Sequence, residues 1–314
     1  MPLDDLTGRC TQPEETTGGS ARLDGMTGDC ARLAPGEIIE DLLCDGLRII
    51  ARRDGFRYGT DSVLLANFAK AKRGEKIVEL CSGTGAVSIL LSAKTRAANI
   101  TGIEIQDCLT CMANRSAELN GLNGKVGFIT GDIRNIREYM GAGSADVVVV
   151  NPPYLRLGSG TGVRAPGGGP LHGGTPDALI CCKPDASIGG PLHGGTPDAL
   201  ICRKPDASIG CPLHGGTPDV SIARYETHCT IADVAGAAAW LLNQGGKLYL
   251  VYRPERLADL FCAMRAAQIE PKTIHFVSAS PEKPPSLVLV SGVKGAAAGL
   301  RYIVDSENRT CDVK

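Results

Sequence analysis

The sequence predicts an α/β protein with a Rossmann-like, seven-stranded, mostly parallel sheet and helices on both faces. Short apolar runs alternate with longer segments in which apolar residues recur at helical spacing, and polar residues gather directly after the runs. Runs that are apolar throughout are typical of strands buried on both faces of a parallel sheet. The chain has 314 residues, 43% of them hydrophobic, which is enough for one large domain.

The strands are expected where the apolar runs lie, at 76–80, 100–105, 126–130, 146–150, 247–252, 273–277 and 286–290. The helices are expected at 61–70, 85–94, 107–120, 231–243 and 254–267. Thr60 or Asp61 can cap the first helix. Gly245 with Gly246 can stop the fourth helix, and Pro254 suits the first turn of the fifth.

Two segments interrupt this alternation and divide the chain. From Pro170, Pro191 and Pro212 one unit recurs, Pro-Leu-His-Gly-Gly-Thr-Pro-Asp, so residues 161–220 are interpreted as a tandem 21-residue repeat insertion. The insertion is rich in glycine and proline and has little apolar area to offset the entropy of ordering, so we expect a flexible surface segment. Residues 1–36 are polar and of low complexity, which predicts a disordered extension. The folded domain is then 37–302, with 303–314 as a tail.

Charge and hydropathy exclude several classes of protein. Lys and Arg number 33 against 34 Asp and Glu, so the chain lacks the basic excess of proteins that coat nucleic acid, and any such contact must be local. No apolar stretch approaches the roughly 20 residues of a membrane span, and the N-terminus lacks the pattern of a secretion signal. We therefore expect a cytoplasmic protein without a membrane partner. Composition does not indicate an oligomeric state.

The thirteen cysteines are scattered through a long chain, which favours free thiols over a disulfide framework. Cys108 and Cys111 form a lone C-x-x-C without a second pair at zinc-site spacing. The histidines His172, His193 and His214 recur only because the repeat does. The sequence therefore predicts no metal.

Polar residues follow three successive predicted strands. Glu79 ends the first, directly before a turn that contains Gly83 and Gly85. Glu104 ends the second strand and can accept hydrogen bonds from both hydroxyls of a ribose. Asp132 follows the third and can meet an adenine amino group, with Ile133 against the ring. In an open α/β sheet ligands bind at such strand ends, so the spacing indicates S-adenosylmethionine.

A nicotinamide cofactor is the main alternative, because Glu104 lies about twenty residues beyond the glycines, as in dinucleotide sites. The turn is followed by Ala86 and Val87, without the third glycine that lets a helix close on its strand around a pyrophosphate. A tight turn without any ligand is the other alternative.

Asn151-Pro152-Pro153-Tyr154 follows the fourth predicted strand. An exocyclic amine on an aromatic ring is a poor nucleophile, because its lone pair is delocalised. If the side-chain carbonyl of Asn151 and the backbone carbonyl of Pro152 each accept one N–H, the lone pair is redirected toward a methyl donor. Tyr154 can stack on the base. Adenine N6, guanine N2, cytosine N4 and a glutamine amide all suit this loop, and an ordinary Pro-rich turn is the alternative.

Four strings of residues bear a specific resemblance: 54–66, 151–160, 222–226 and 250–257. They resemble the bacterial tRNA(Val) adenine N6-methyltransferase family over residues 37–302, apart from the repeats. The resemblance implies an enzyme with a seven-stranded Rossmann-like methyltransferase domain that uses S-adenosylmethionine to methylate the tRNA adenosine just 3′ of the anticodon. Cofactor contacts are implied for Tyr58, Gly59, Thr60, Asp61, Glu79, Cys81, Gly83, Gly85, Glu104, Asp132, Ile133 and Asn151.

The same resemblance places the base among Asn151, Pro152, Pro153 and Tyr154, and the anticodon arm of tRNA is the expected partner. Arg57, Arg156 and Arg224 could supply local positive charge for its phosphates. The chain departs from the family pattern in its insertion, which falls between 151–160 and 222–226, where the family has a short loop near the substrate. Three alternatives stay open: a release-factor glutamine methyltransferase, an rRNA or DNA base methyltransferase, and a non-catalytic RNA-binding module in which the insertion blocks turnover.

Overall fold

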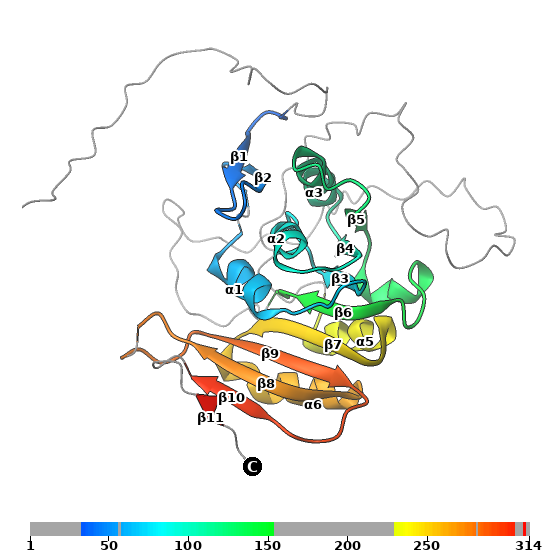
Figure 1. Ribbon diagram of the computed structural model, residues 1–314, viewed down its shortest axis with the longest axis vertical. Coiled ribbons are helices and arrows are strands. Elements are labelled where there is room, and N and C mark those ends of the chain that lie inside the picture. The colour runs from blue at the N-terminus through cyan, green and yellow to red at the C-terminus, as the bar shows by residue number, and fades with distance from the viewer. Residues whose placement is uncertain (1–32, 56–57, 154–228, 281, 305–309, 312–314) are drawn as a thin grey trace, which may run out of the picture.

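The computed structural model describes residues 33–55, 58–153, 229–280, 282–304 and 310–311 (Figure 1). The whole repeat insertion and most of the N-terminal extension lie outside these residues. Four of the predicted site residues lie outside them as well: Arg57, Tyr154, Arg156 and Arg224.

One nine-stranded sheet forms the centre, in the order β11-β10-β8-β9-β7-β6-β3-β4-β5. The seven expected strands are present as β3 (Lys76–Leu80), β4 (Asn99–Glu104), β5 (Val126–Thr130), β6 (Ala145–Val150), β7 (Leu242–Tyr252), β8 (Ile269–Val277) and β9 (Leu287–Lys294). The five strands from β3 to β7 are parallel to one another, and β9 runs antiparallel to both β7 and β8. The expected mostly parallel α/β fold is therefore confirmed.

Two short strands extend the sheet beyond the seven that were expected. They are β10 (Arg301–Val304), parallel to β8, and β11 (Thr310–Cys311), antiparallel to β10. The sheet thus continues past residue 302, where the sequence analysis ended the domain. With four and two residues, β10 and β11 are too short to show a strand pattern in the sequence.

Helices cover both faces of the sheet. On one face lie α1 (Thr60–Phe68), α2 (Ala86–Lys94) and α3 (Asp107–Leu119); on the other lie α5 (Ile231–Leu241), α6 (Leu257–Ala266) and the 3-10 helix η2 (Ile133–Glu138). Strand β6 shows why its sequence is apolar throughout. Val147 and Val149 pack under the first set of helices, Val148 and Val150 under the second, and all four are fully buried.

Helix ends differ in detail from the expected ones. Gly59 rather than Thr60 is the N-cap of α1. Helix α5 ends at Leu241, before it reaches Gly245 and Gly246, which lie within β7 instead. Pro254 begins the 3-10 turn η4 (Pro254–Arg256) that precedes α6.

A two-stranded hairpin that the sequence analysis did not predict packs on α3. It consists of β1 (Glu37–Asp41) and β2 (Arg48–Arg52). Ile50 packs with Leu109 and Met112 of α3, and the Arg115 guanidinium pairs with Glu37 at 2.5 Å. Strand β1 is only half-buried, so it lacks the apolar run that identified the other strands. No helix among the described residues has the length and apolar character that crossing a membrane requires.

Candidate active site

The order of the strands reverses beside β3. From β3 the chain adds β4 and β5 on one side and then β6 and β7 on the other, so the carboxyl ends of β3 and β6 border the switch point, where ligands bind in such sheets. A pocket opens there. Its walls include nine of the predicted site residues: Tyr58, Glu79, Cys81, Gly83, Glu104, Asp132, Ile133, Asn151 and Pro153. Asn151 and Gly83 therefore lie in one pocket, as the proposed chemistry requires.

Five other predicted site residues are described but are not among those that line this pocket: Gly59, Thr60, Asp61, Gly85 and Pro152. The lining also contains residues that the sequence analysis did not single out, among them Ser62, Ser82 and Cys229. Cys229 lies directly before α5, far along the chain from the other walls. No local sequence pattern could have indicated its position.

Glu104 stands at the end of β4 and is 6% exposed. Its Oε2 accepts a hydrogen bond from the Gly83 N–H at 2.9 Å, and its Oε1 accepts one from the Gln106 N–H at 3.1 Å. Burial raises the pKa of this carboxyl, while the backbone donors act in the opposite direction. The Ile105 N–H also lowers this pKa as a backbone donor, so three backbone groups act on the carboxyl. Because the two oxygens together have about four acceptor sites, the group can still accept a hydrogen bond from a ribose hydroxyl.

The turn after β3 contains three residues with a left-handed backbone, Cys81 (φ 55°), Gly83 (φ 55°) and Gly85 (φ 83°). A left-handed backbone is uncommon for a residue with a side chain, so Cys81 is the unusual member. A Cβ at Gly85 would lie 2.5 Å from Cζ of Phe128. Gly85 thus permits the close packing of α2 on β5, whereas Gly83 lines the pocket.

Glu79 ties β3 to α2 and is 1% exposed. Its Oε2 accepts hydrogen bonds from the Ser88 N–H at 2.9 Å and from the Ser88 hydroxyl at 2.5 Å. Burial raises the pKa of Glu79 to about 8 in spite of these bonds. Burial thus favours the protonated form of the carboxyl group in the folded protein at neutral pH.

Ser82 supplies a polar group that no described residue satisfies. The residue is 6% exposed and lines the pocket, and among the described residues its Oγ has no hydrogen-bond partner. A buried hydroxyl without a partner is costly, which makes its position in a pocket wall informative. Together with Glu104, it fits a bound molecule that carries several polar groups.

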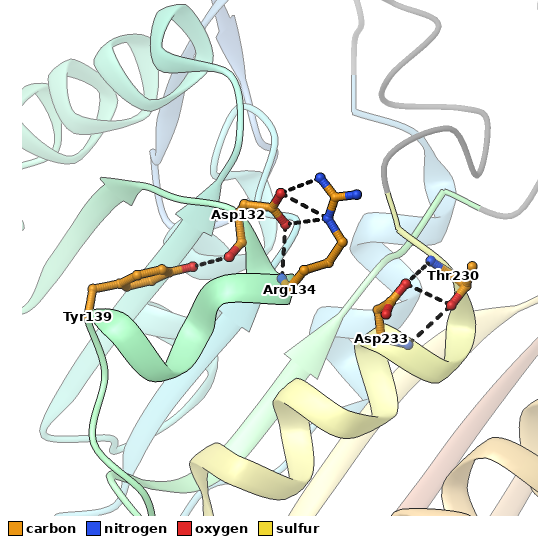
Figure 2. A network of polar contacts seen from close by, with 5 residues as sticks. All are labelled: Asp132, Arg134, Tyr139, Thr230 and Asp233. Carbon is orange, nitrogen blue, oxygen red and sulfur yellow. Dashed lines mark hydrogen bonds and ion pairs between the residues drawn. The ribbon is translucent and has the colours of Figure 1, made fainter. Parts of the chain in front are cut away.

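Asp132 is held in a defined orientation by Arg134 (Figure 2). The carboxylate caps η2 by accepting from the Arg134 N–H at 2.9 Å, and it pairs with the guanidinium at 2.5 Å. The Tyr139 hydroxyl donates to the Asp132 carbonyl at 2.8 Å. Across from this cluster, Thr230 and Asp233 form the capping box of α5. The sequence analysis assigned Asp132 to an adenine amino group but did not foresee its partner Arg134.

Asn151 follows β6, and its side chain is held by α1. Its Nδ2 donates to Asp61 Oδ2 at 3.0 Å and lies 3.4 Å from the Ser62 hydroxyl. Pro152 and Pro153 continue the loop and are both buried. The loop therefore stands at the switch point with its first side chain fixed.

Two thiols meet in the same pocket. Cys229 and Cys81 form a side-chain hydrogen bond, which together with burial raises the pKa of the Cys81 thiol. All six cysteines with described side chains are free thiols, Cys108 and Cys111 among them. The described residues contain no cluster of three or more His, Cys, Asp or Glu side chains suited to a metal ion.

Residues 53–163 match the family model of the methyltransferase small domain. This part of the chain is therefore similar to the methyltransferase small domain. The match extends from before α1 to beyond β6 and so includes the turn after β3, Glu104, Asp132 and the Asn151 loop. S-adenosylmethionine is the cofactor that the strand ends predict, and Glu104 and Ser82 offer polar groups in the pocket that fit it.

Three curated relatives differ in what their names say they act on. A tRNA1(Val) (adenine(37)-N6)-methyltransferase from Glaesserella parasuis serovar 5 (strain SH0165) is 29% identical over 32% of this chain and 41% of its own length. A 4-amino-L-phenylalanine/4-methylamino-L-phenylalanine methyltransferase from Streptomyces pristinaespiralis is 33% identical over 26% of each. A Methanocaldococcus jannaschii protein, provisionally named a protein N5-glutamine methyltransferase, is 30% identical over 35% of this chain and 53% of its own. The chain thus spans about half or less of the length of each of these relatives.

Proposed function

We propose that this protein methylates a planar amine with S-adenosylmethionine, and that the amine is N6 of the adenosine just 3′ of the anticodon in a tRNA. The observation that carries the first part is the Asn151 amide, whose N–H group is bound by Asp61 while the residue lines the cofactor pocket. With the N–H side occupied, its carbonyl is the atom that is left to accept from a substrate. Each of the three relatives bears a name that refers to an amine or amide nitrogen, which supports the same chemistry.

Methyl transfer to an amine requires the protein mainly to orient the two reacting groups. S-adenosylmethionine supplies a methyl group on a sulfonium that leaves as a neutral thioether, so little acid or base assistance is needed. The amine must be held with its lone pair directed at that methyl group, and the Asn151 and Pro152 carbonyls accept its two N–H bonds for this purpose. Proline stiffens the loop that carries both carbonyls. Catalysis then consists mainly of orientation.

The tRNA substrate is supported by the Glaesserella relative and by the physical state of an anticodon loop. Bases in such loops are already partly unstacked, so little energy is needed to place one in a pocket. Tyr154 is proposed to stack on the base. Arg57, Arg156 and Arg224 are proposed to contact nearby phosphates, with Pro153 beside the base.

A glutamine amide is the second candidate, because the Methanocaldococcus relative matches over a larger part of its own length than the tRNA enzyme does. The same two carbonyls would hold a primary amide. The two candidate substrates would differ only in which residues around the Asn151 loop contact them.

The experiment uses the full chain, labelled S-adenosylmethionine and unmodified tRNA(Val) made by transcription. Label is expected in N6-methyladenosine, and it should be lost when the adenosine 3′ of the anticodon is replaced by guanosine. A release factor is the competing substrate, and labelled glutamine in it would instead establish the second candidate. Asn151→Ala should abolish transfer, whereas the matched Asn99→Ala, at the amino end of β4, should not.

A further inference from the structure

We infer that Asp61 is a positioning residue, which sets the orientation of the Asn151 amide and thereby aims its carbonyl at the substrate amine. The inference rests on the proposed function. The two residues are 90 positions apart in the chain and come from different elements, α1 and the loop after β6. Their contact is a hydrogen bond of 3.0 Å between Asn151 Nδ2 and Asp61 Oδ2.

The chemistry of the pair fixes which end of the amide faces Asp61. A carboxylate accepts hydrogen bonds and cannot donate them, whereas an amide has a donor end and an acceptor end. The NH2 group of Asn151 must therefore face Asp61, and the Ser62 hydroxyl, 3.4 Å away, is a second acceptor on the same side. If the Asn151 amide were turned the other way, its oxygen would face the Asp61 carboxylate oxygen without a hydrogen between them. The carbonyl oxygen is thus kept for the substrate.

Each oxygen of the Asp61 carboxylate accepts one hydrogen bond. Oδ2 accepts from Asn151, and Oδ1 accepts from the N–H of Ser62 at 2.9 Å. Asp61 does not line the pocket, although the family resemblance implies that it contacts the cofactor. The geometry gives it an indirect role through Asn151. Gly59 makes room for this arrangement, since a Cβ there would lie 2.5 Å from Asp61 Oδ1.

Asp61→Asn separates this role from a purely structural one. The new amide keeps one acceptor oxygen, which can still bind the Ser62 N–H, but it presents N–H groups to Asn151. The Asn151 amide then rotates and turns its carbonyl away from the substrate. We expect kcat for the amine to fall by about 10- to 100-fold, the usual cost of misplacing a reacting group. The dissociation constant for S-adenosylmethionine should change by less than about twofold, because binding of the cofactor does not use this bond.

The exchange variant Asp61→Asn with Asn151→Asp provides a rescue. In Asn151→Asp alone, two carboxylates face each other without a donor between them, so kcat should also fall. In the double variant the amide at position 61 donates to the carboxylate at position 151, which keeps a free oxygen for the substrate. We expect kcat to recover by about tenfold over the lower single variant, a coupling that independent sites do not show.

Gly59→Ala tests the same point without changing either polar partner, because the added methyl group displaces the Asp61 carboxylate. Gly59→Ala should lower kcat and leave cofactor binding unchanged.

Asp259→Asn is the matched control for Asp61→Asn, because Asp259 lies in the first turn of α6 and outside the pocket lining. Circular dichroism melting curves verify that each variant is folded.

The outcomes are distinguishable. Unchanged kcat in Asp61→Asn, or in a folded Gly59→Ala, overturns the inference and leaves the proposed function standing. A cofactor dissociation constant that rises in step with the loss of kcat shows direct contact and also overturns it, as does a double variant without recovery. If the wild-type protein methylates neither tRNA nor a glutamine substrate, the proposed function itself fails.

Discussion

The carboxylate of Glu104 binds the backbone N–H of Gly83, with 2.9 Å between Glu104 Oε2 and the nitrogen. The bond joins the end of β4 to the turn after β3, so one side chain both shapes the turn and offers acceptors to the pocket. An ionisable group that is fixed by backbone donors and retains acceptor capacity is suited to bind a ribose hydroxyl.

Glu104→Gln should therefore weaken cofactor binding. The amide keeps the size of the side chain but replaces one acceptor oxygen with a donor, so one oxygen fewer can accept from the Gly83 N–H or from a ribose hydroxyl. The dissociation constant for S-adenosylmethionine should rise by about tenfold or more, measured by titration calorimetry. Glu282→Gln, on an exposed residue between β8 and β9, is the matched control and should bind normally. Equal affinity in the two variants would contradict the role of Glu104.

Ser82→Ala should have opposite effects on the free protein and on binding. The hydroxyl is buried and has no partner among the described residues, so its removal relieves a desolvation cost. The melting temperature of the cofactor-free protein should stay the same or rise, while cofactor affinity falls several-fold. A loss of stability with unchanged affinity would show that the hydroxyl serves the fold.

Glu79 should make stability depend on pH. Its pKa is raised from 4.5 to about 8 in the folded protein, so between these values the folded state binds more protons than the unfolded state. The free energy of unfolding should accordingly fall as pH rises through this window and level off above about 8. Glu104, whose pKa is also raised, contributes in the same direction.

Glu79→Gln isolates the contribution of Glu79. The neutral amide can still accept from the Ser88 N–H but does not titrate. Denaturant unfolding at pH 5 and pH 8 should give a smaller difference in the variant than in the wild type. Identical pH profiles would mean that Glu79 is not protonated in the folded state.

Gly85→Ala should destabilise the fold through a clash with Phe128. The backbone there is left-handed, and the new Cβ would lie 2.5 Å from the ring. Gly121→Ala is a matched control, because Gly121 also has a left-handed backbone (φ 65°) but nothing within 4 Å of its Cβ position. Strain of about 1 kcal/mol is common to both, and overpacking should add about 1–3 kcal/mol at Gly85 alone. Equal losses in thermal unfolding would exclude the clash.

The strands were predictable where both faces are buried. The run from Val147 to Val150 is apolar because each side chain packs under a helix, and its end therefore marks Asn151. Strand β1, with one half-exposed face, and the short β10 and β11 leave no comparable pattern.

Side-chain partners were less accessible to sequence reasoning. Strand ends indicated Glu104, Asp132 and Asn151, because the ends of parallel strands meet at one edge. The contact between Asp61 and Asn151 depends on how α1 packs across 90 residues of chain, and no local spacing encodes it. Arg134 resembles any surface arginine until η2 folds it onto Asp132. The predictions for Arg57, Tyr154, Arg156 and Arg224 lie outside the described residues and stay predictions.

The most direct measurement is nucleoside mass spectrometry of tRNA(Val) from cells with and without this protein, complemented by the wild-type chain or by Asn151→Ala. N6-methyladenosine 3′ of the anticodon should disappear when the protein is removed, return with the wild type and fail to return with Asn151→Ala. The same amount of N6-methyladenosine in all four samples would contradict the account.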